Sequence, residues 1–270
     1  MTDGGRRMAT ATGAMLADPA CLGNPPQITA QTAQSLFDPV ALFDPEFWRA
    51  RGELRDVTGG RGAAWFIESD SRRWALRHYR RGGFIAHFSQ DRYLWMGEDR
   101  VRAFAEWRLL DELCRLGLPV PKPVAARYER LGWSYRCDLI TQRIVGAAPL
   151  SAVLARDSLP EPQWRAIGAA IARLHRAGVD HADLNAHNIL IDAAGLVSVI
   201  DFDRGRLRGP RAHGGPGGPG GQRSQRGQHA WAARNMQRLH RSLVKISRGL
   251  EAGRFSTSAW DWLLAGYEAA

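Results

Sequence analysis

The sequence predicts an α+β fold with a small, β-rich N-terminal lobe and a larger, helical C-terminal lobe. Short runs typical of strands dominate residues 56–141, and helical periodicity dominates residues 160–268. The chain has 270 residues, 44% of them hydrophobic, so it can bury one large core or two small ones. We expect a disordered tail over residues 1–35, the N-terminal, nucleotide-binding lobe over residues 36–145, and the C-terminal, catalytic lobe over residues 146–270.

The N-terminal lobe is predicted to contain an antiparallel meander followed by a helix. Within residues 56–79, three apolar runs are separated by a glycine-rich turn at 59–62 and a polar turn at 69–71. Residues 99–116 carry apolar side chains at helical spacing, and Gly117 is a typical residue to end a helix. The glycine-rich turn therefore lies between two strands that precede the helix.

The rest of the chain is predicted to contain, in order, two strands, a helix, a short hairpin and two closing helices. These elements are expected at residues 124–130, 133–141, 160–177, 189–200, 229–249 and 257–268. Residues 209–227 are rich in glycine and proline without a period, so they cannot bury apolar surface. We expect this run to be a disordered insert in the C-terminal lobe.

The charge and cysteine content narrow the class of protein. The chain has 37 Lys and Arg against 27 Asp and Glu, a net charge of +10, yet its only lysines are Lys122 and Lys245. This charge indicates an acidic partner, or else an arginine-rich composition without function. Cys21, Cys114 and Cys137 are too widely spaced for a disulfide framework, and no apolar run approaches the ~20 residues of a membrane span. We predict a cytoplasmic location.

One phrase in the C-terminal lobe carries a specific chemical signal. Residues 181–191 read H-A-D-L-N-A-H-N-I-L-I, and residues 199–203 read V-I-D-F-D. A loop of the form H-x-D-L-x-x-x-N, followed by two short strands and D-F, is typical of kinase-like phosphotransferases. Asp183 can supply the carboxylate near the attacking hydroxyl. Asn188 and Asp201 stand at the two ends of the predicted hairpin, where hard oxygen ligands can hold Mg²⁺.

Two histidines of the same loop have roles that the sequence leaves open. His181 is interpreted as a structural residue that packs under the loop. His187 either contacts the substrate or caps a turn. Neither is predicted to be a catalytic residue.

The nucleotide side of the prediction rests on the meander and the following helix. Gly59, Gly60 and Gly62 allow backbone amides to approach phosphates, although the same glycines also suit a simple hairpin turn. The third strand contains W-A-L-R at residues 74–77, where kinases carry V-A-I-K. Arg77 therefore occupies the position of the kinase lysine. Arginine must therefore supply the positive charge. Glu106 on the helix either pairs with Arg77 or remains solvated.

Together these motifs resemble the 3-deoxy-D-manno-octulosonic acid (Kdo) kinase family of the lipopolysaccharide-kinase group. The matching phrases, within residues 36–268, are L-R-H-Y-R-R-G-G (76–83), G-L-P-V-P-K-P (117–123), H-A-D-L-N-A-H-N-I-L (181–190), D-F-D (201–203) and N-M-Q-R-L-x-R-S-L (235–243). The resemblance implies a two-lobed protein-kinase-like fold. It also implies ATP-dependent phosphorylation of the 4-hydroxyl of Kdo on a Kdo–lipid A precursor in lipopolysaccharide core biosynthesis. The enzyme would then lie peripherally on the cytoplasmic face of the inner membrane.

The resemblance also assigns roles to individual residues. Asp183 would be the base, with Asn188 and Asp201 as Mg²⁺ ligands. Arg77 and Glu106 would form the ion pair on the phosphate side. Ala182 stands where protein kinases carry the arginine that reads a phosphorylated activation loop, and Asp203 replaces the glycine of D-F-G. We therefore expect no regulation by phosphorylation of that loop.

Other readings stay open at this point. A kinase of the same fold could phosphorylate a core heptose, an aminoglycoside or a protein, and the missing strand lysine is compatible with a non-catalytic pseudokinase scaffold. A nucleic-acid binder would explain the charge but leave residues 181–191 unexplained, so we expect no nucleic acid partner. The basic residues 78–81 and the aromatic residues that follow, up to Trp95, suit either an anionic membrane surface or the interior of the lobe.

Overall fold

The structure is a computed structural model. It describes residues 5–22, 38–56, 64–69, 72–80, 91–208, 221–251 and 253–270. The chain divides into two compact units, which are treated separately below. Unit 1 comprises Met1–Glu112 and Pro121–Arg143, and unit 2 comprises Leu113–Val120 and Ile144–Ala270. Unit 1 is rich in β-strands and unit 2 is mainly helical, which confirms the predicted α+β fold class with a β-rich and a helical part.

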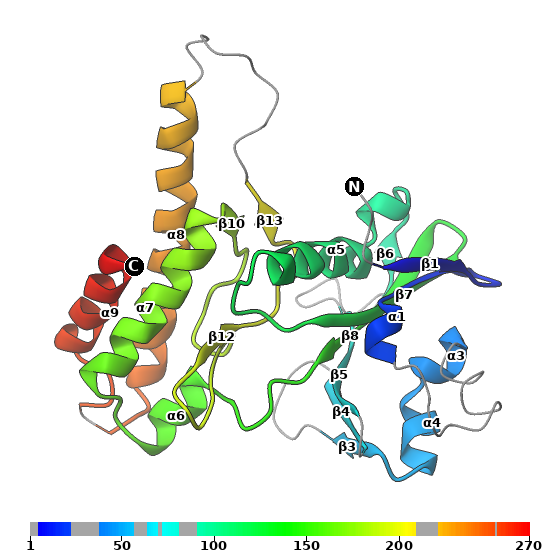
Figure 1. The fold of residues 1–270 in the computed structure, drawn as a ribbon, viewed down its shortest axis with the longest axis horizontal. Coiled ribbons are helices and arrows are strands. Elements are labelled where there is room, and N and C mark those ends of the chain that lie inside the picture. Colours follow the sequence, from blue (N-terminus) through cyan, green and yellow to red (C-terminus); the bar gives the residue numbers. More distant parts are fainter. Residues whose placement is uncertain are drawn as a thin grey trace. The chain divides into compact units, whose positions relative to one another are not determined.

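Unit 1 is built on an antiparallel sheet (Figure 1). Its described strands are β1 (Arg6–Ala9), β2 (Gly13–Ala17), β3 (Leu54–Asp56), β4 (Ala64–Ser69), β5 (Arg72–His78), β6 (Tyr93–Leu94), β7 (Pro123–Leu131) and β8 (Ser134–Gln142). They are ordered β1-β2-β7-β8-β5-β4-β3, with β6 paired to β8. The predicted meander corresponds to β3, β4 and β5, and the two strands predicted after the helix correspond to β7 and β8.

The prediction of a disordered tail over residues 1–35 is wrong for residues 5–22. β1 and β2 form a hairpin, β2 pairs with β7, and α1 (Pro19–Leu22) follows. Residues 14–17 of β2 are fully buried. The reason is tertiary, because the short A-M-L-A run is stable only when β7 supplies its hydrogen bonds and the core covers its side chains. Residues 1–4 and 23–35 lie outside the described residues.

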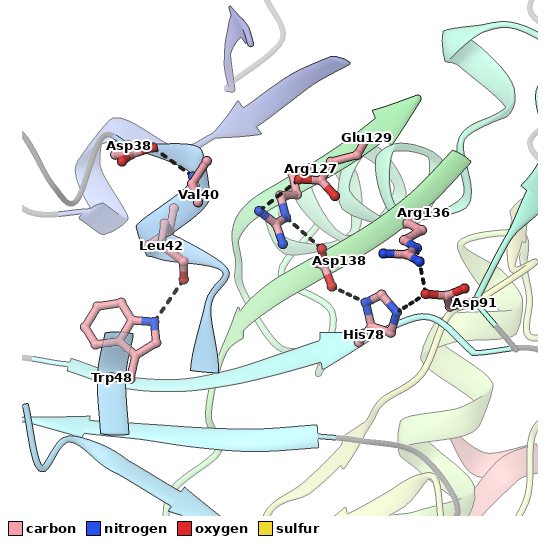
Figure 2. Close-up of polar contacts among 10 residues, drawn as sticks. All are labelled: Asp38, Val40, Leu42, Trp48, His78, Asp91, Arg127, Glu129, Arg136 and Asp138. Carbon is pink, nitrogen blue, oxygen red and sulfur yellow. Dashed lines mark hydrogen bonds and ion pairs between the residues drawn. The ribbon is translucent and has the colours of Figure 1, made fainter. Parts of the chain in front are cut away.

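Two short helices, α3 (Pro39–Leu42) and α4 (Pro45–Ala50), begin by the same local rule. Asp38 and Asp44 precede a proline at the first helical position, and each carboxylate accepts a backbone N–H two residues on. Trp48 of α4 donates its indole N–H to the carbonyl of Leu42 at 2.9 Å (Figure 2). The ring of Trp48 is fully buried and meets Trp74 of β5 edge to face. These helices therefore join the core of unit 1.

α5 (Arg102–Arg115) is the helix predicted over residues 99–116, preceded by one 3₁₀ turn, η2 (Glu98–Arg100). Phe104 and Trp107 of α5 are fully buried. The ring of Phe104 meets Tyr128 of β7 edge to face, with centroids 5.2 Å apart. Gly117 has a φ of +66°, as a residue that ends a helix requires.

Unit 2 contains four helices and short strands among its described residues. They are β9 (Ala148–Pro149), α6 (Leu150–Arg156), α7 (Glu161–Arg176), β10 (Val179–Asp180), β11 (Ile189–Ile191), β12 (Val197–Val199), β13 (Arg206–Leu207), α8 (Gly221–Ser247) and α9 (Thr257–Ala269). α7 and α9 lie side by side (Figure 1). Their backbones approach closely at Gly168, which has no side chain. A Cβ at this position would lie only 2.0 Å from the carbonyl oxygen of Leu263. The predicted hairpin, α7 and the two closing helices are confirmed.

The predicted disordered insert needs one correction. Of residues 209–227, the last seven lie in α8, which begins at Gly221, and residues 209–220 lie outside the described residues. Gln and Arg are good helix formers and extend the helix in spite of Gly227.

Two sequence-based expectations about the whole chain can be compared with the described residues. Cys21, Cys114 and Cys137 are all described, and no disulfide joins them. Across the described segments, no helix combines the length and the apolarity that crossing a membrane requires.

Candidate active site

Residues 181–188, the predicted catalytic loop, connect β10 to β11 in unit 2. Internal hydrogen bonds fix its shape. The side-chain amides of Asn185 and Asn188 both donate to the backbone carbonyl of Asp183, at 3.1 and 2.9 Å. The carboxylate of Asp183 itself is exposed. The loop thus presents one acidic group to solvent on a backbone that two asparagines hold in place.

His181 packs under this loop, as the sequence suggested. It is 2% exposed, its Nδ1 accepts the backbone N–H of Asp183 at 3.1 Å, and its Nε2 lies 3.0 Å from the carbonyl of Ile200. Its ring lies against Phe202, with centroids 4.7 Å apart. Burial lowers the pKa of His181. A neutral ring that donates from Nε2 and accepts at Nδ1 satisfies both contacts and ties the loop to residues 200–202.

Asn188 and Asp201 are brought together by the hairpin of β11 and β12. Ile189 is opposite Val199, and the backbone N–H of Ile200 donates to the carbonyl of Asn188 at 2.9 Å. Asn188 therefore pairs across the hairpin with Ile200, the residue that precedes Asp201. Asp201 adopts a φ of +63°, which is a strained backbone conformation for a residue other than glycine. Such strain persists only where the surrounding structure enforces it, as happens at functional sites.

The donor set at this hairpin end fits Mg²⁺. Because the side-chain nitrogen of Asn188 is engaged with Asp183, its Oδ1 lies at the other end of the amide. With the carboxylate of Asp201 it offers two hard oxygens, and Mg²⁺ commonly takes one or two protein ligands together with waters and phosphates. Among the described residues, no group of three or more His, Cys, Asp or Glu side chains suits a metal ion.

Two residues of α8 hold the catalytic loop, and sequence reasoning missed both roles. Asn235, 2% exposed, accepts the backbone N–H of His181 at 3.0 Å and donates to Asp180 at 3.0 Å. Ser242 accepts the backbone N–H of Ala186 at 3.2 Å. Their spacing of seven residues places both on one face of the helix. The sequence signal for these two roles is an Asn and a Ser seven residues apart, on the helix face that is expected to be buried.

Among the described residues, the side chain of His187 caps no turn. Its ring is exposed, and Nδ1 lies 2.8 Å from the hydroxyl of Ser151 at the start of α6. The turn is instead held by Asn185, whose side chain accepts the backbone N–H of His187 at 2.8 Å.

In unit 1, Arg77 of β5 and Glu106 of α5 form an ion pair. Glu106 is 3% exposed, so its charge is shielded from water. Tyr79 completes the group, because its hydroxyl donates to Glu106, accepts from Arg77 at 3.0 Å, and its ring lies 4.6 Å from the Arg77 guanidinium. Burial raises the pKa of Tyr79 well above its ordinary value. Sequence reasoning paired Arg77 with Glu106 and missed Tyr79.

The proposed phosphate loop cannot be placed, because Gly59, Gly60 and Gly62 lie outside the described residues. The aromatic segment is described only in part. Tyr93 is 7% exposed and its ring lies 5.6 Å from that of Tyr135, and Trp95 packs on Tyr128. Tyr93 therefore belongs to the interior of unit 1, whereas Trp95 is half-buried.

A second charged group of unit 1 lies at the end of β5 (Figure 2). The Nδ1 of His78 lies 2.6 Å from Asp138, which also accepts from Arg127 at 2.8 Å. On the other side of the ring, Nε2 is 3.6 Å from Asp91, which Arg136 contacts at 2.7 Å. The hydrogen bond to Asp138 raises the pKa of His78 against the opposing effect of burial. The group links β5, β7 and β8.

Comparisons with known proteins match most of the chain. Residues 45–214 match the model of the lipopolysaccharide kinase (Kdo/WaaP) family. A protein of Xanthomonas oryzae named 3-deoxy-D-manno-octulosonic acid kinase is 45% identical over 232 residues, 85% of this chain and 84% of its own length. A protein of the same name from Xylella fastidiosa is 46% identical over 205 residues, 76% of this chain and 75% of its own. The chain therefore belongs to the lipopolysaccharide kinase (Kdo/WaaP) family and is a phosphotransferase that acts on an alcohol group.

Proposed function

We propose that this chain transfers the γ-phosphoryl group of ATP to the 4-hydroxyl of Kdo on a Kdo–lipid A precursor, in the biosynthesis of the lipopolysaccharide core. The observation that carries the proposal is the catalytic loop, in which Asn188 is bonded to the backbone of Asp183 and aligned with the residue before Asp201. The family and the names of the relatives support the acceptor. The position of the hydroxyl comes from the resemblance noted in the sequence.

Asp183 is the proposed catalytic base. Its exposed carboxylate accepts the proton of the attacking sugar hydroxyl as the oxygen bonds to the γ-phosphorus and the bond to the β-phosphate oxygen breaks. His181, Asn185 and Asn188 hold its backbone, so the carboxylate keeps its position as the hydroxyl approaches. Positioning of this kind supplies much of the rate enhancement in phosphoryl transfer.

Asn188 and Asp201 are the proposed ligands of Mg²⁺. When bound, the ion would neutralise charge on the phosphate oxygens of ATP. Arg77 is the proposed cation on the phosphate side, oriented by Glu106 and Tyr79, in place of the lysine of other kinases. Gly59, Gly60 and Gly62 are proposed to contact the phosphates through their backbone amides.

We also propose that the enzyme acts at the cytoplasmic face of the inner membrane as a peripheral protein. The acceptor is a lipid, so its sugar must be met at a bilayer surface. A net charge of +10 favours contact with anionic headgroups.

The test is phosphoryl transfer from γ-labelled ATP, with and without Mg²⁺, to four acceptors: Kdo linked to the lipid A precursor, free Kdo, an aminoglycoside and a generic protein. We expect transfer to the lipid-linked Kdo, and an NMR spectrum of the product with phosphorus coupled to the proton at carbon 4. Transfer to another acceptor alone would contradict the proposal. A protein that binds ATP without any transfer would support the scaffold reading.

A further inference from the structure

The net positive charge of the chain is concentrated in one segment. Residues 204–250 contain 11 Lys and Arg and no Asp or Glu, a formal charge of +11 in a chain whose total is +10. Much of this segment is α8, the long helix of unit 2 (Figure 1). The remainder of the chain is therefore close to neutral, and the excess of positive charge lies within this segment.

Within α8 the charges are aligned. Arg234, Arg238, Arg241 and Lys245 follow one another at intervals of four, three and four residues, which places them along one face of a helix. Arg234, Arg241 and Lys245 are exposed, and Arg238 is half-buried. We call these four residues the basic stripe of α8.

The basic stripe lacks the partners that several other cations of unit 2 have. Within the described part of the chain, none of its four side chains makes an ion pair or a hydrogen bond. By contrast, Arg208 is paired with Asp180 at 2.7 Å. Like charges spaced four residues apart destabilise a helix, so the stripe has an energetic cost that no contact within the described residues offsets. An external anion would offset it.

The stripe adjoins the catalytic loop. Asn235 and Ser242 bind the backbone of the loop, and Arg238 lies three residues after the first and four before the second, on the same side of α8. The charge of Arg238 is near enough to His181 to contribute, after burial, to the lowered pKa of that histidine. A group bound by Arg238 would thus lie close to Asp183, two residues beyond His181.

We propose that the basic stripe of α8 binds the acidic groups of the phosphoryl acceptor, with Arg238 as the central contact and Arg241 and Lys245 beside it. The inference rests on the proposed function, whose acceptor is a sugar acid on a phosphorylated lipid. Carboxylate and phosphate share the oxygen pair that a guanidinium binds through two parallel hydrogen bonds. Such contacts orient the sugar toward Asp183 and favour acidic acceptors over neutral sugars.

The test compares charge-removing variants of the full chain. Arg238→Gln, Arg241→Gln and Lys245→Gln each remove one stripe charge, and Arg156→Gln removes an exposed charge at the end of α6 as the matched control. Three quantities are measured: the equilibrium affinity for the detergent-solubilised Kdo–lipid A precursor, the KM for the acceptor and the KM for ATP. A second acceptor, stripped of its lipid phosphates, separates contacts to phosphate from contacts to the carboxylate.

For Arg238→Gln we expect acceptor affinity about tenfold weaker and an acceptor KM raised by a similar factor, with the KM for ATP within about twofold. Arg241→Gln and Lys245→Gln should show smaller losses, Arg238→Lys partial rescue, and Arg156→Gln no change. If the dephosphorylated acceptor shows the same losses, the contact is to the carboxylate. Melting temperatures show whether each variant is folded.

Unchanged acceptor affinity and KM in all three stripe variants would overturn the inference and leave the proposed function intact. Acceptor binding that depends on the stripe, without transfer at the 4-hydroxyl, would overturn the proposed function and leave the stripe as an acceptor site. In the last measurement, the same variants are tested for binding to vesicles of anionic phospholipid without acceptor. Loss of vesicle binding with unaltered acceptor affinity would identify the stripe as a membrane contact and contradict the proposal.

Discussion

Two groups of cationic side chains, one in each unit, are held in different ways. In unit 1, Arg77 is paired with the buried Glu106, and Arg127 with the nearly buried Asp138. In unit 2, the basic stripe of α8 has no such partners within the described residues, and Asp183 is exposed on a loop whose backbone is held by others. A charge paired inside the fold is part of its stability, whereas an exposed charge on a rigid support is available to a substrate.

The largest expected effect concerns Asp183, the exposed acidic group in this comparison. Asp183→Asn should lower kcat for phosphoryl transfer by about 10³-fold, because it removes the proposed base. It should leave the melting temperature within about 1 °C, because no hydrogen bond or ion pair among the described residues uses the Asp183 carboxylate. Rapid-quench transfer assays and thermal melts measure the two quantities. Asp261→Asn, the same change at an exposed position of α9, serves as control. Near-normal kcat in Asp183→Asn would remove Asp183 from the mechanism.

Glu106→Gln tests the paired side. The substitution leaves the guanidinium of Arg77 without its buried counter-charge, so we expect the free energy of unfolding to fall by about 2–3 kcal/mol. The KM for ATP should also rise, because Arg77 loses its orientation. Denaturant titration measures the stability, with Glu46→Gln, which breaks an exposed pair with Arg49, as control at under about 0.5 kcal/mol. Equal decreases in the free energy of unfolding in the two variants would show that the buried pair stabilises the fold no more than the exposed pair.

Asn235→Ala sharpens the comparison, because Asn235 supports the catalytic loop without reaching a substrate. Removing its amide leaves the backbone N–H of His181 and one oxygen of Asp180 without their partner, at an expected cost of about 1–2 kcal/mol in unfolding free energy. As a positioning residue it should lower kcat with little change in the KM for ATP. A rise in the KM for ATP at unchanged kcat would contradict this role.

The smallest expected effect concerns pH and the histidine group of unit 1 (Figure 2). Asp138 raises the pKa of His78 in the folded state, with smaller effects from Asp91 in the same direction and from Arg80 in the opposite one. The contribution of His78 to stability is therefore complete below the unfolded pKa of about 6.5 and is lost as pH rises through the folded pKa. The difference in melting temperature between the wild type and His78→Gln should be larger at pH 6 than at pH 9. A constant difference would mean that the proton on His78 adds no stability.

Local patterns predicted those elements that carry a clear local signal in the sequence. The helix α7 and the hairpin of β11 and β12 follow from periodicity and turn residues, and they lie where the sequence indicated. Failure occurred at β1 and β2, where the A-M-L-A run has no local signal and depends on pairing with β7. The start of α8 was placed too late because a glycine-rich composition was read as disorder.

The amino-acid sequence by itself determined the fold class, the family and the identity of the candidate catalytic residues. Asp183, Asn188 and Asp201 lie in a phrase short enough for spacing to define their geometry, since one hairpin joins them. Only the tertiary structure decided which groups support them. Tyr79 joins Glu106 across 27 positions of sequence, and Asn235 reaches His181 across 54. Contacts over such distances depend on how strands and helices pack, which no local pattern of residues encodes.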